Sequence, residues 1–586
     1  MALAVASRAA EAAETGQDQR RLSQWVGGDL GLCLEIEDLP RHWADFAAGP
    51  LAKRLAVFAP LVAWREQNRG MLSAVRAEIE RRTGVSPKLL LTQLLGGKVL
   101  FAIWPPADLP SGQPNVLLLA EAVDQNLMRS TLKTLVSARK KAGKWRGETT
   151  LQVAQESFVI DAVVPDDENA EFFITSADRV AMIATSQTIL QDVLQRRAGE
   201  RGESSLAALA AYRAACERLA ADAAGRLFIN PRAWDSALRA DFERKPPDSA
   251  AAHSQKAIVE AWAAIDYVAA VGYLDRNLNA QLAWQWRADG LPPAWREVVG
   301  SLAGRSSLVE QLPGDALVAT AAHADLGRLV RLMIANEWKN IRGNFKKQSE
   351  SVLAWALAAG IGPDLGGYLK APAAGGSGKE PFPLEAVVAV ETRPLEPGAG
   401  RPALVHQVEP LLHAWLSAVV TAANHQDGDK PATMKTEVLA DGGAATVISG
   451  VLPGYPRQEL AYRVDKQDRL WVATSPRLLI VSDAPGLLAD RILEAGRARG
   501  GNIQGLAYVN LAGWRELAAR GRESVDFLWR DKRHDERASE REYRQLQAFL
   551  QLADQLLLTS SIDEATVHLS LSVAAGDPEG NGKSGG

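Results

Sequence analysis

The sequence predicts an α+β fold built of two tandem related repeats, with largely antiparallel sheets and flanking helices. Three observations predict it. The composition is that of a globular protein, with 47% hydrophobic and 23% charged residues. Strand-like runs are too many for a helical solenoid, and helical runs are too frequent for a β-sandwich. Matching segments recur in the same order in the two halves of the 586-residue chain.

The clearest match joins residues 225–234 to residues 505–514. Both segments contain Gly, an aromatic residue, a β-branched residue, Asn and Trp at the same spacing, and Asn230 and Asn510 lie 280 residues apart (510 − 230). Five further pairs are collinear with it: Gly28-Asp29 with Gly314-Asp315, Leu95-Gly96-Gly97 with Leu365-Gly366-Gly367, 117–121 with 387–391, Val164-Pro165 with Leu452-Pro453, and Thr175-Ser176 with Thr474-Ser475. Collinear matches of this number indicate an internal duplication.

Each predicted repeat begins with a strand that leads into a helix. These helices are expected over 38–58 and 325–338, where Asp38 and Asp325 would cap the first turn. The Leu-Gly-Gly segments are expected to be turns. Strands at 99–104 and 116–123 follow in the first repeat, and the next helix is expected over 125–138, or over 408–423 in the second repeat.

The rest of each repeat is predicted as hairpins, a strand–helix unit and a closing strand. The unit is expected at 180–183 and 188–195, and again at 478–481 and 485–495. Asn230 and Asn510 stand where a side-chain oxygen can cap a helix. The closing strands are expected to turn one alternating face toward the core, namely Leu278, Ala280, Leu282, Trp284 and Trp286 in the first repeat and Val567, Leu569, Leu571 and Val573 in the second.

Breaks in the pattern set the predicted domain limits. Gly290, Pro292, Pro293 and Gly304 interrupt any long element between the repeats. The predicted parts are an N-terminal extension or residual signal region at 1–27, a first repeat at 28–290, a linker at 291–312, a second repeat at 313–575 and a disordered tail at 576–586.

Charge and cysteine content argue against several function classes. The net charge is −4, from 66 basic and 70 acidic residues, which gives no overall field to attract nucleic acid. Cys33 lies in a strand-like run and Cys216 in a helical one, so we expect buried small side chains, with a disulfide between them as the alternative. No apolar stretch reaches the roughly 18 residues of a membrane span, so no transmembrane segment is expected.

The N-terminal residues leave two interpretations of location open. Residues 2–12 are rich in alanine and resemble a signal-peptide cleavage region, but they lack a basic segment and a long apolar core. They are either the end of a signal peptide or an alanine-rich helical extension. The first interpretation is favoured and predicts an extracytoplasmic protein, periplasmic or secreted; the second predicts a cytoplasmic one.

The Gly-Asp opening strand, the Leu-Gly-Gly segment, the apolar strand ending in Glu121 or Glu391 and the Thr-Ser strand–helix unit together resemble an uncharacterised bacterial domain-of-unknown-function family. The resemblance spans about residues 28–575. It implies a large, often exported α+β protein, and it carries over no catalytic residues because none are known for that family.

Four glycine-rich or charged motifs lack a residue, spacing or context that the chemistry they suggest requires. In 374–380 a P-loop would need Ser or Thr after Lys379, but Glu380 follows. The tail 582–586 has no strand–turn–helix context for a nucleophile elbow. Residues 360–366 are one residue too long for a dinucleotide fingerprint. The acidic residues at 166–168 with Glu171 lack the spacing of a calcium loop and predict a solvated hairpin tip.

Histidines, basic runs and tryptophans were also considered as ligand sites. His406 and His413 would lie roughly 10 Å apart along a helix, too far for one metal ion. The basic runs 139–146 and 339–347 lie near helix C-termini, and 530–544 alternates in sign like an exposed helix. Trp234 and Trp514 are expected to fill equivalent core positions; an aromatic groove for sugars, lipids or peptides is the alternative.

The sequence therefore predicts no catalytic, cofactor-binding or metal-binding residues. The expected function is that of a non-enzymatic binding or scaffold protein of the bacterial cell envelope, with an unidentified protein or envelope ligand, no nucleic-acid partner and an open oligomeric state. The alternatives are a hydrolase-type enzyme with a site assembled from scattered residues, and a lipid or lipoprotein carrier. Close titratable groups in a concave pocket of one repeat would favour the enzyme, and an apolar groove without them would favour binding.

Overall fold

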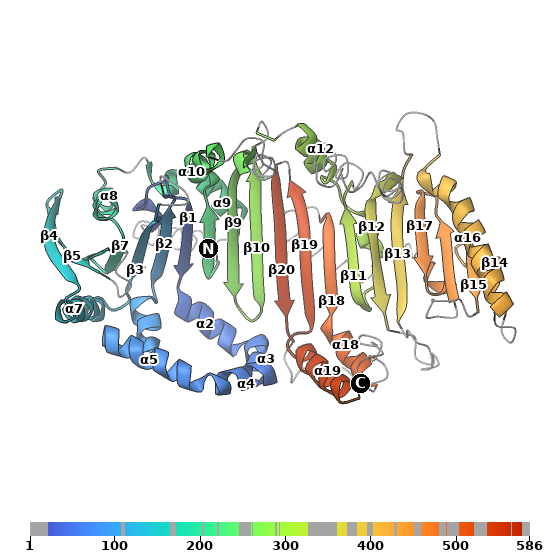
Figure 1. Cartoon of the computed structure of the whole chain (residues 1–586), viewed down its shortest axis with the longest axis horizontal. Helices are drawn as coiled ribbons and strands as arrows, with labels where there is room; N and C mark the ends of the chain where they lie inside the picture. The colour runs from blue at the N-terminus through green and yellow to red at the C-terminus, as the bar shows by residue number, and fades with distance from the viewer. Residues whose placement is uncertain are drawn as a thin grey trace, which may run out of the picture. The chain divides into compact units, whose positions relative to one another are not determined.

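A computed structural model gives the fold of the chain (Figure 1). It describes residues 22–106, 112–164, 171–201, 204–219, 222–244, 259–260, 262–287, 290–291, 293–325, 360–371, 384–394, 402–426, 431–450, 459–479, 488, 503–520, 525, 536–563 and 565–576. The chain divides into two compact units. The first contains residues 1–49 and 60–290, and the second contains residues 50–59 and 291–586.

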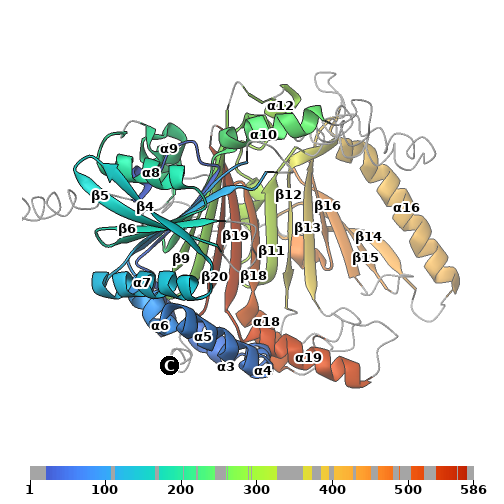
Figure 2. The same ribbon diagram turned by 60° about the vertical axis from the view of Figure 1, so that its left-hand side comes forward.

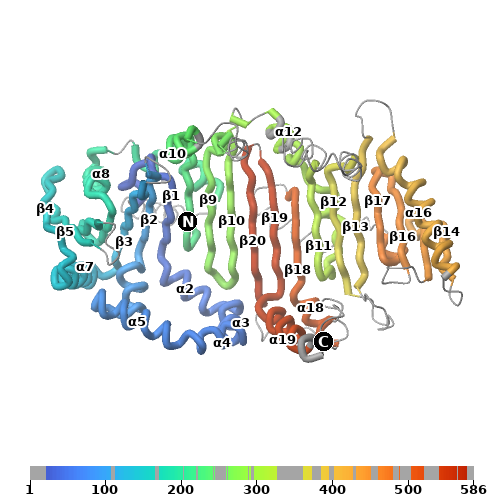
Figure 3. Tube along the Cα trace, in the orientation of Figure 1, coloured from blue at the N-terminus to red at the C-terminus, as the bar shows by residue number. Residues whose placement is uncertain are grey.

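The first unit is built on an antiparallel sheet. Its described strands pair in the order β4 (Trp145–Val153), β5 (Glu156–Val163), β6 (Phe172–Ala177), β7 (Val180–Ala184), β3 (Asn115–Glu121), β2 (Lys98–Trp104), β1 (Leu32–Glu37), β8 (Gly225–Ile229), β9 (Ile265–Leu274) and β10 (Leu278–Trp286). The trace can be followed in Figure 3.

The described strands of the second unit pair in the same order of succession. They are β14 (Thr433–Val438), β15 (Ala444–Ser449), β16 (Glu459–Val464), β17 (Arg469–Ala473), β13 (Glu385–Thr392), β12 (Ile361–Lys370), β11 (Ala316–His323), β18 (Gly505–Asn510), β19 (Gln555–Asp563) and β20 (Thr566–Ala574). Helices accompany both sheets, so the predicted α+β class with antiparallel sheets is confirmed.

Helices and short helical turns connect these strands. In the first unit they are η1 (Leu22–Gln24), α2 (Leu39–Ala48), α4 (Ala59–Gln67), α5 (Arg69–Thr83), α6 (Pro87–Leu89), η2 (Leu90–Leu94), α7 (Gln125–Lys141), α8 (Gln187–Arg197), η4 (Leu206–Ala208), α9 (Ala210–Arg218) and α10 (Pro231–Glu243). In the second they are α3 (Pro50–Val57), α12 (Pro293–Ser301), η5 (Ser307–Gln311), α16 (Leu404–Gln426), η6 (Pro476–Leu479), α18 (Leu511–Ala519) and α19 (Glu536–Leu550).

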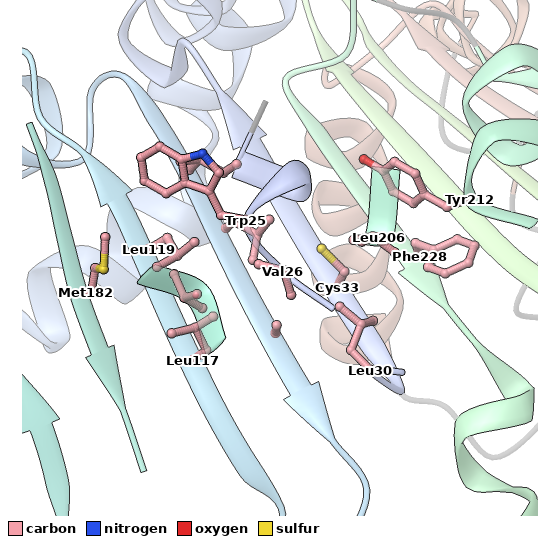
Figure 4. Packing of buried hydrophobic residues seen from close by; sticks show 14 of the residues in the cluster. Trp25, Val26, Leu30, Cys33, Leu117, Leu119, Met182, Leu206, Tyr212 and Phe228 are labelled. Atoms are coloured by element: carbon pink, nitrogen blue, oxygen red, sulfur yellow. The ribbon is translucent and has the colours of Figure 1, made fainter. Parts of the chain in front are cut away.

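One face of the first sheet forms the core of its unit. A row of directly paired residues on this face is almost inaccessible to water: Ala184, Leu117, Ala102, Cys33, Phe228, Ala269 and Ala283. Side chains from α8, η4, α9 and the segment after η1 pack over it, including Leu190, Leu206, Tyr212 and Trp25. Figure 4 labels Trp25, Leu206 and Tyr212 of this set. We call this the buried face; the matching face of the second sheet packs against Leu308, Val309 and Leu479.

Helix caps follow the predictions at two of the four positions proposed. The Oδ1 atom of Asn510 accepts a hydrogen bond from Gly513 N at 2.8 Å, and that of Asn230 accepts one from Arg232 N at 3.1 Å, so both are confirmed. The cap at Asp38 is wrong. Its backbone is left-handed (φ 48°) and its carboxylate pairs with Arg41 instead. The helix expected from Asp325 lies outside the described residues.

Two of the collinear matches are wrong. Leu365, Gly366 and Gly367 lie inside β12 rather than in a turn. A side chain at Gly367 would place its Cβ 2.4 Å from the carbonyl oxygen of Val387, so glycine serves close backbone approach there. The second error pairs Thr175, which lies inside β6, with Thr474, which follows β17.

The residue that matches Thr474 in its contacts is Thr185. Its Oγ1 accepts a hydrogen bond from Val116 N at 2.8 Å, and its own N–H donates to Val116 O at 3.0 Å. Thr474 makes the same two bonds with Ala386, at 2.9 and 3.0 Å. The strand predicted at 478–481 is also wrong, because Leu478 and Leu479 belong to η6.

The remaining strand and helix predictions mostly agree with the structure. Helices 125–138, 188–195 and 408–423 correspond to α7, α8 and α16, and the helix expected over 38–58 is interrupted at Gly49-Pro50. Cys33 lies in β1 and Cys216 in α9, and neither forms a disulfide. Pro165, Leu452 and Pro453 of the match between Val164-Pro165 and Leu452-Pro453 lie outside the described residues, as does the tail after 576.

The second unit is tied together by a carboxylate at Asp554. Arg54 of α3 donates to both oxygens of Asp554, at 2.9 and 3.0 Å, and Arg515 and the N–H of Gly576 also donate to it. Burial on its own raises the pKa of Asp554, but these hydrogen bonds outweigh burial and hold the pKa below its ordinary value.

Acidification should therefore weaken the second unit through Asp554. A carboxyl whose pKa is lowered on folding stabilises the protein above its unfolded pKa of about 3.9, and that stabilisation is lost as the pH falls through the folded value. We expect the free energy of unfolding to fall more steeply below pH 4 in the wild type than in Asp554→Asn. Parallel acid titrations of the two proteins, followed by urea unfolding, would contradict this if the curves differ only by a constant.

Candidate functional site

The face of the first sheet opposite the buried face is apolar and only half-buried. Because successive side chains alternate across a strand, the residues next to the buried row share this second face. Directly paired positions again form a row: Ile183, Leu118, Phe101, Leu34, Leu227, Ala270 and Leu282. Each is partly accessible to water. We call this surface the open face of the first unit.

The open face shows that the core prediction for the closing strand is wrong in the first unit, and the 40% exposed Leu571 of β20 shows that it is also wrong for Leu571 in the second. Leu282 and Trp284 lie on the open face, whereas Ala283, between them, belongs to the core. Trp284 pairs with Val268, and Ala283 with the fully buried row through Ala269. The reason is that both faces of these strands are apolar, so alternation could not tell the core face from the other.

The second unit carries the corresponding row, and its side chains are smaller and more exposed. Directly paired positions run Val388, Gly367, Thr320, Ala507, Leu558 and Leu571 across β13, β12, β11, β18, β19 and β20. The exposed fractions of Val388, Leu558 and Leu571 are 54%, 43% and 40%. We call this row the open row.

The middle of the open row has little side-chain volume, and its polar side chain, Thr320, already has a hydrogen-bond partner. Gly367 must stay side-chain-free because of the nearby Val387 carbonyl, and Ala507 contributes one methyl group. The Thr320 hydroxyl donates to the carbonyl oxygen of Leu506 at 3.1 Å, so it does not need an acceptor from a ligand. Leu558, Leu571 and Val388 stand on either side of this low centre.

The dimensions of the open row suit an elongated apolar molecule. Six neighbouring strands spaced by about 4.8 Å give a row roughly 24 Å long. One leaflet of a bilayer has a hydrocarbon depth of about 15 Å, so an acyl chain is shorter than the row. The row contains no titratable residue. It can therefore hold an apolar ligand by contact but offers no group for catalysis.

Two clusters contain the titratable residue types found in enzyme sites. The first lies inside the first unit, where Glu35 accepts hydrogen bonds from the Tyr212 hydroxyl at 2.5 Å and from Arg226 at 3.4 Å. Burial, followed by the charge of Glu35, raises the pKa of Cys33 and that of Tyr212. Glu35 and Arg226 are only 6% and 8% exposed, so a substrate has no access to them.

The second cluster contains the residue types of a serine hydrolase without its geometry. Ser307 Oγ donates to Asp364 Oδ2 at 2.6 Å, and His323 Nδ1 lies 2.7 Å from Asp364 Oδ1. A nucleophilic serine must instead bond to the histidine that accepts its proton. The other ring nitrogen of His323 lies against Gly304. Asp364 therefore holds η5 against β11 and β12, and the cluster is structural.

The histidines and tryptophans singled out in the sequence have separate partners. His406 Nε2 lies 2.7 Å from Asp468, and His413 Nδ1 lies 3.0 Å from the Tyr462 hydroxyl. Trp514 is buried and Trp234 is half-buried, each in the helix that follows a capping asparagine. In the part of the chain that the structure describes, no three His, Cys, Asp or Glu residues are placed to hold a metal ion.

Most of the remaining motifs fall outside the described residues. These are 166–168, 339–347, 374–380, 530–535 and 582–586. Residues 360–366 include the start of β12 and form no dinucleotide loop. Lys140 of the basic run 139–146 lies 3.9 Å from Asp161 and above the ring of Trp145. No described helix is both long and apolar enough to cross a bilayer.

Comparison with known proteins does not assign a function. No family model, no curated protein and no solved structure matches the chain. The resemblance to a domain-of-unknown-function family and the extracytoplasmic location stay predictions. The open faces are the feature that sequence reasoning missed, and the available signal was the apolar character of strands such as 98–104 on both of their faces.

Proposed function

We propose that this chain is a non-enzymatic binding protein whose open row holds an elongated apolar ligand of the size of a lipid acyl chain. The exposed, apolar row from Val388 to Leu571 carries the proposal. An antiparallel sheet that faces water on one side normally has polar residues there. Covering this row with apolar surface would gain about 25 cal/mol for each Å² removed from water.

We further propose that the two units are tandem related repeats whose open faces have diverged. The common strand order and the matching bonds of Thr185 and Thr474 support this. At corresponding register positions the first unit has Phe101, Leu34 and Leu227 where the second has Gly367, Thr320 and Ala507. The larger side chains occupy in the first unit the space that the second leaves to a ligand.

Binding of a dansyl-labelled fatty acid to the delipidated protein tests the proposed function. We expect saturable binding that Ala507→Arg weakens at least tenfold, because the guanidinium would occupy the centre of the open row. Val438→Arg is the matched control, since Val438 is 79% exposed at the end of β14, away from the row. Non-saturable binding, or equal affinity of the two variants, would rule the proposal out.

A further inference from the structure

Some of the helices of the first unit form a layer with exposed apolar side chains. The layer comprises α4, α5, α6, η2 and α7, and α5 packs against α7 (Figure 2). The exposed fractions of Leu61 and Trp64 on α4 are 43% and 49%, and those of Met71 and Val75 on α5 are 53% and 52%. Met71 and Val75 are four residues apart and so lie on the same side of α5.

The stripe on α5 leads into an open groove between α5 and α7. The groove has a volume of about 630 Å³ and is lined mainly by apolar atoms, from Val75, Ile79, Leu90 and Leu135 among others. Arg82 and Arg139 also line it, as does Glu78, which pairs with Arg82. Apolar surface with arginines beside it suits an amphiphile that has an acyl chain and an anionic headgroup.

The same layer carries an excess of positive charge. Residues 60–94 contain six Lys or Arg and three Glu, and α7 contains five Lys or Arg and no acidic residue, so the layer has a net charge of +8 (11 − 3). The whole chain has a net charge of −4, so the rest of it has −12. The sequence alone hid this concentration because α5 and α7 are separated along the chain.

Two of the three acidic side chains of the layer pair with arginines within it. Glu78 accepts hydrogen bonds from Arg81 and Arg82, which hold the pKa of Glu78 at about 2, and Glu80 pairs with Arg76 at 3.1 Å. Arg129 and Lys133 lie exposed on α7. The same group of helices therefore carries both surplus positive charge and exposed tryptophan and aliphatic side chains.

We propose that this basic helical layer docks the protein on the surface of an anionic phospholipid bilayer. Peripheral helices bind membranes when an apolar side enters the headgroup region while Lys and Arg meet anionic lipids. Tryptophan favours that interface, which gives Trp64 a role that a polyanion such as nucleic acid would not. The proposal does not depend on the ligand of the open row.

Flotation of the full chain with vesicles tests the proposal. We expect binding to vesicles of equal parts phosphatidylglycerol and phosphatidylcholine, at least tenfold weaker binding to pure phosphatidylcholine, and loss of binding at high salt. Trp64→Ser with Met71→Ser and Val75→Ser, and separately Arg129→Glu with Lys133→Glu, should each lower binding at least tenfold. All five residues are exposed, so both variants should keep the wild-type thermal unfolding curve.

Leu411→Ser with Trp415→Ser on α16 is the matched control. These two side chains are 69% and 62% exposed, but α16 contains no Lys or Arg. The control variant should bind anionic vesicles like the wild type. Equal binding to neutral and anionic vesicles, unchanged binding of both layer variants, or an equal loss in the α16 control would overturn the proposal.

Discussion

Replacing Glu35 by alanine is expected to lower the free energy of unfolding of the first unit by about 3–5 kcal/mol. Glu35 and Arg226 are both almost fully buried, and the Tyr212 hydroxyl donates to the same carboxylate oxygen, Oε2. The substitution leaves a buried guanidinium without its carboxylate, and it leaves the tyrosine hydroxyl without its acceptor. Urea unfolding followed by tryptophan fluorescence would measure the change.

The second unit supplies the control for this prediction. At the register positions of Glu35 and Arg226 it has Ala321 and Leu506, which are 1% and 4% exposed. Replacing a buried ion pair by apolar residues is often neutral or stabilising. Glu35→Ala combined with Arg226→Leu and Tyr212→Phe should therefore regain most of the lost stability. A combined variant that is less stable than Glu35→Ala alone would contradict the account.

The parts of the fold that were predicted correctly are those set by local chemistry. An asparagine between a strand and a helix can satisfy exposed N–H groups wherever it occurs, so Asn230 and Asn510 were recognisable as caps. The helices at 125–138 and 408–423 show apolar spacing that does not depend on the rest of the chain. The strand at 117–121 and the matching strand of the second unit at 387–391 are continuous apolar runs, which is typical of buried strands.

The errors arise where the surroundings of a residue are set by a part of the chain that is distant in sequence. Gly366 and Gly367 looked like a turn, but they sit in a strand because neighbouring strands approach closely. Leu282 and Trp284 looked like core, yet the face of Ala283 is the one that α8 and α9 help to cover. No local pattern reveals which face of a doubly apolar strand the helices will choose. The open row and the basic layer were hidden for the same reason.

The apolar residues on both faces of these strands, which removed the usual alternation of polar and apolar positions, also bear on function. Selection for stability alone would replace exposed leucines on a water-facing sheet by polar residues, because their burial stabilises nothing there. Val388, Leu558 and Leu571 would then be early candidates, since they are large apolar side chains with exposed fractions of 54%, 43% and 40%. Their presence is explained if an apolar ligand covers them. Large exposed apolar patches on proteins usually mark binding sites for ligands, proteins or membranes.

Replacing Asp364 by alanine is expected to destabilise the second unit by about 3 kcal/mol, whereas Ser307→Ala should cost only about 1 kcal/mol. Asp364 is 4% exposed and accepts from the N–H and hydroxyl of Ser307, at 2.8 and 2.6 Å, and it also contacts His323. Loss of Asp364 leaves the N–H and hydroxyl of Ser307 and the ring of His323 without their buried acceptor. Loss of the serine hydroxyl leaves Asp364 with its two other partners, the N–H of Ser307 and the ring of His323.

The same variants separate a structural cluster from a serine hydrolase. A fluorophosphonate probe reacts with a serine that a histidine activates, and here the Ser307 hydroxyl is bonded to a carboxylate. We expect the wild type to remain unlabelled at Ser307 and Asp364→Ala to lower the unfolding midpoint. Labelling of Ser307 that disappears in His323→Gln would establish the enzyme instead.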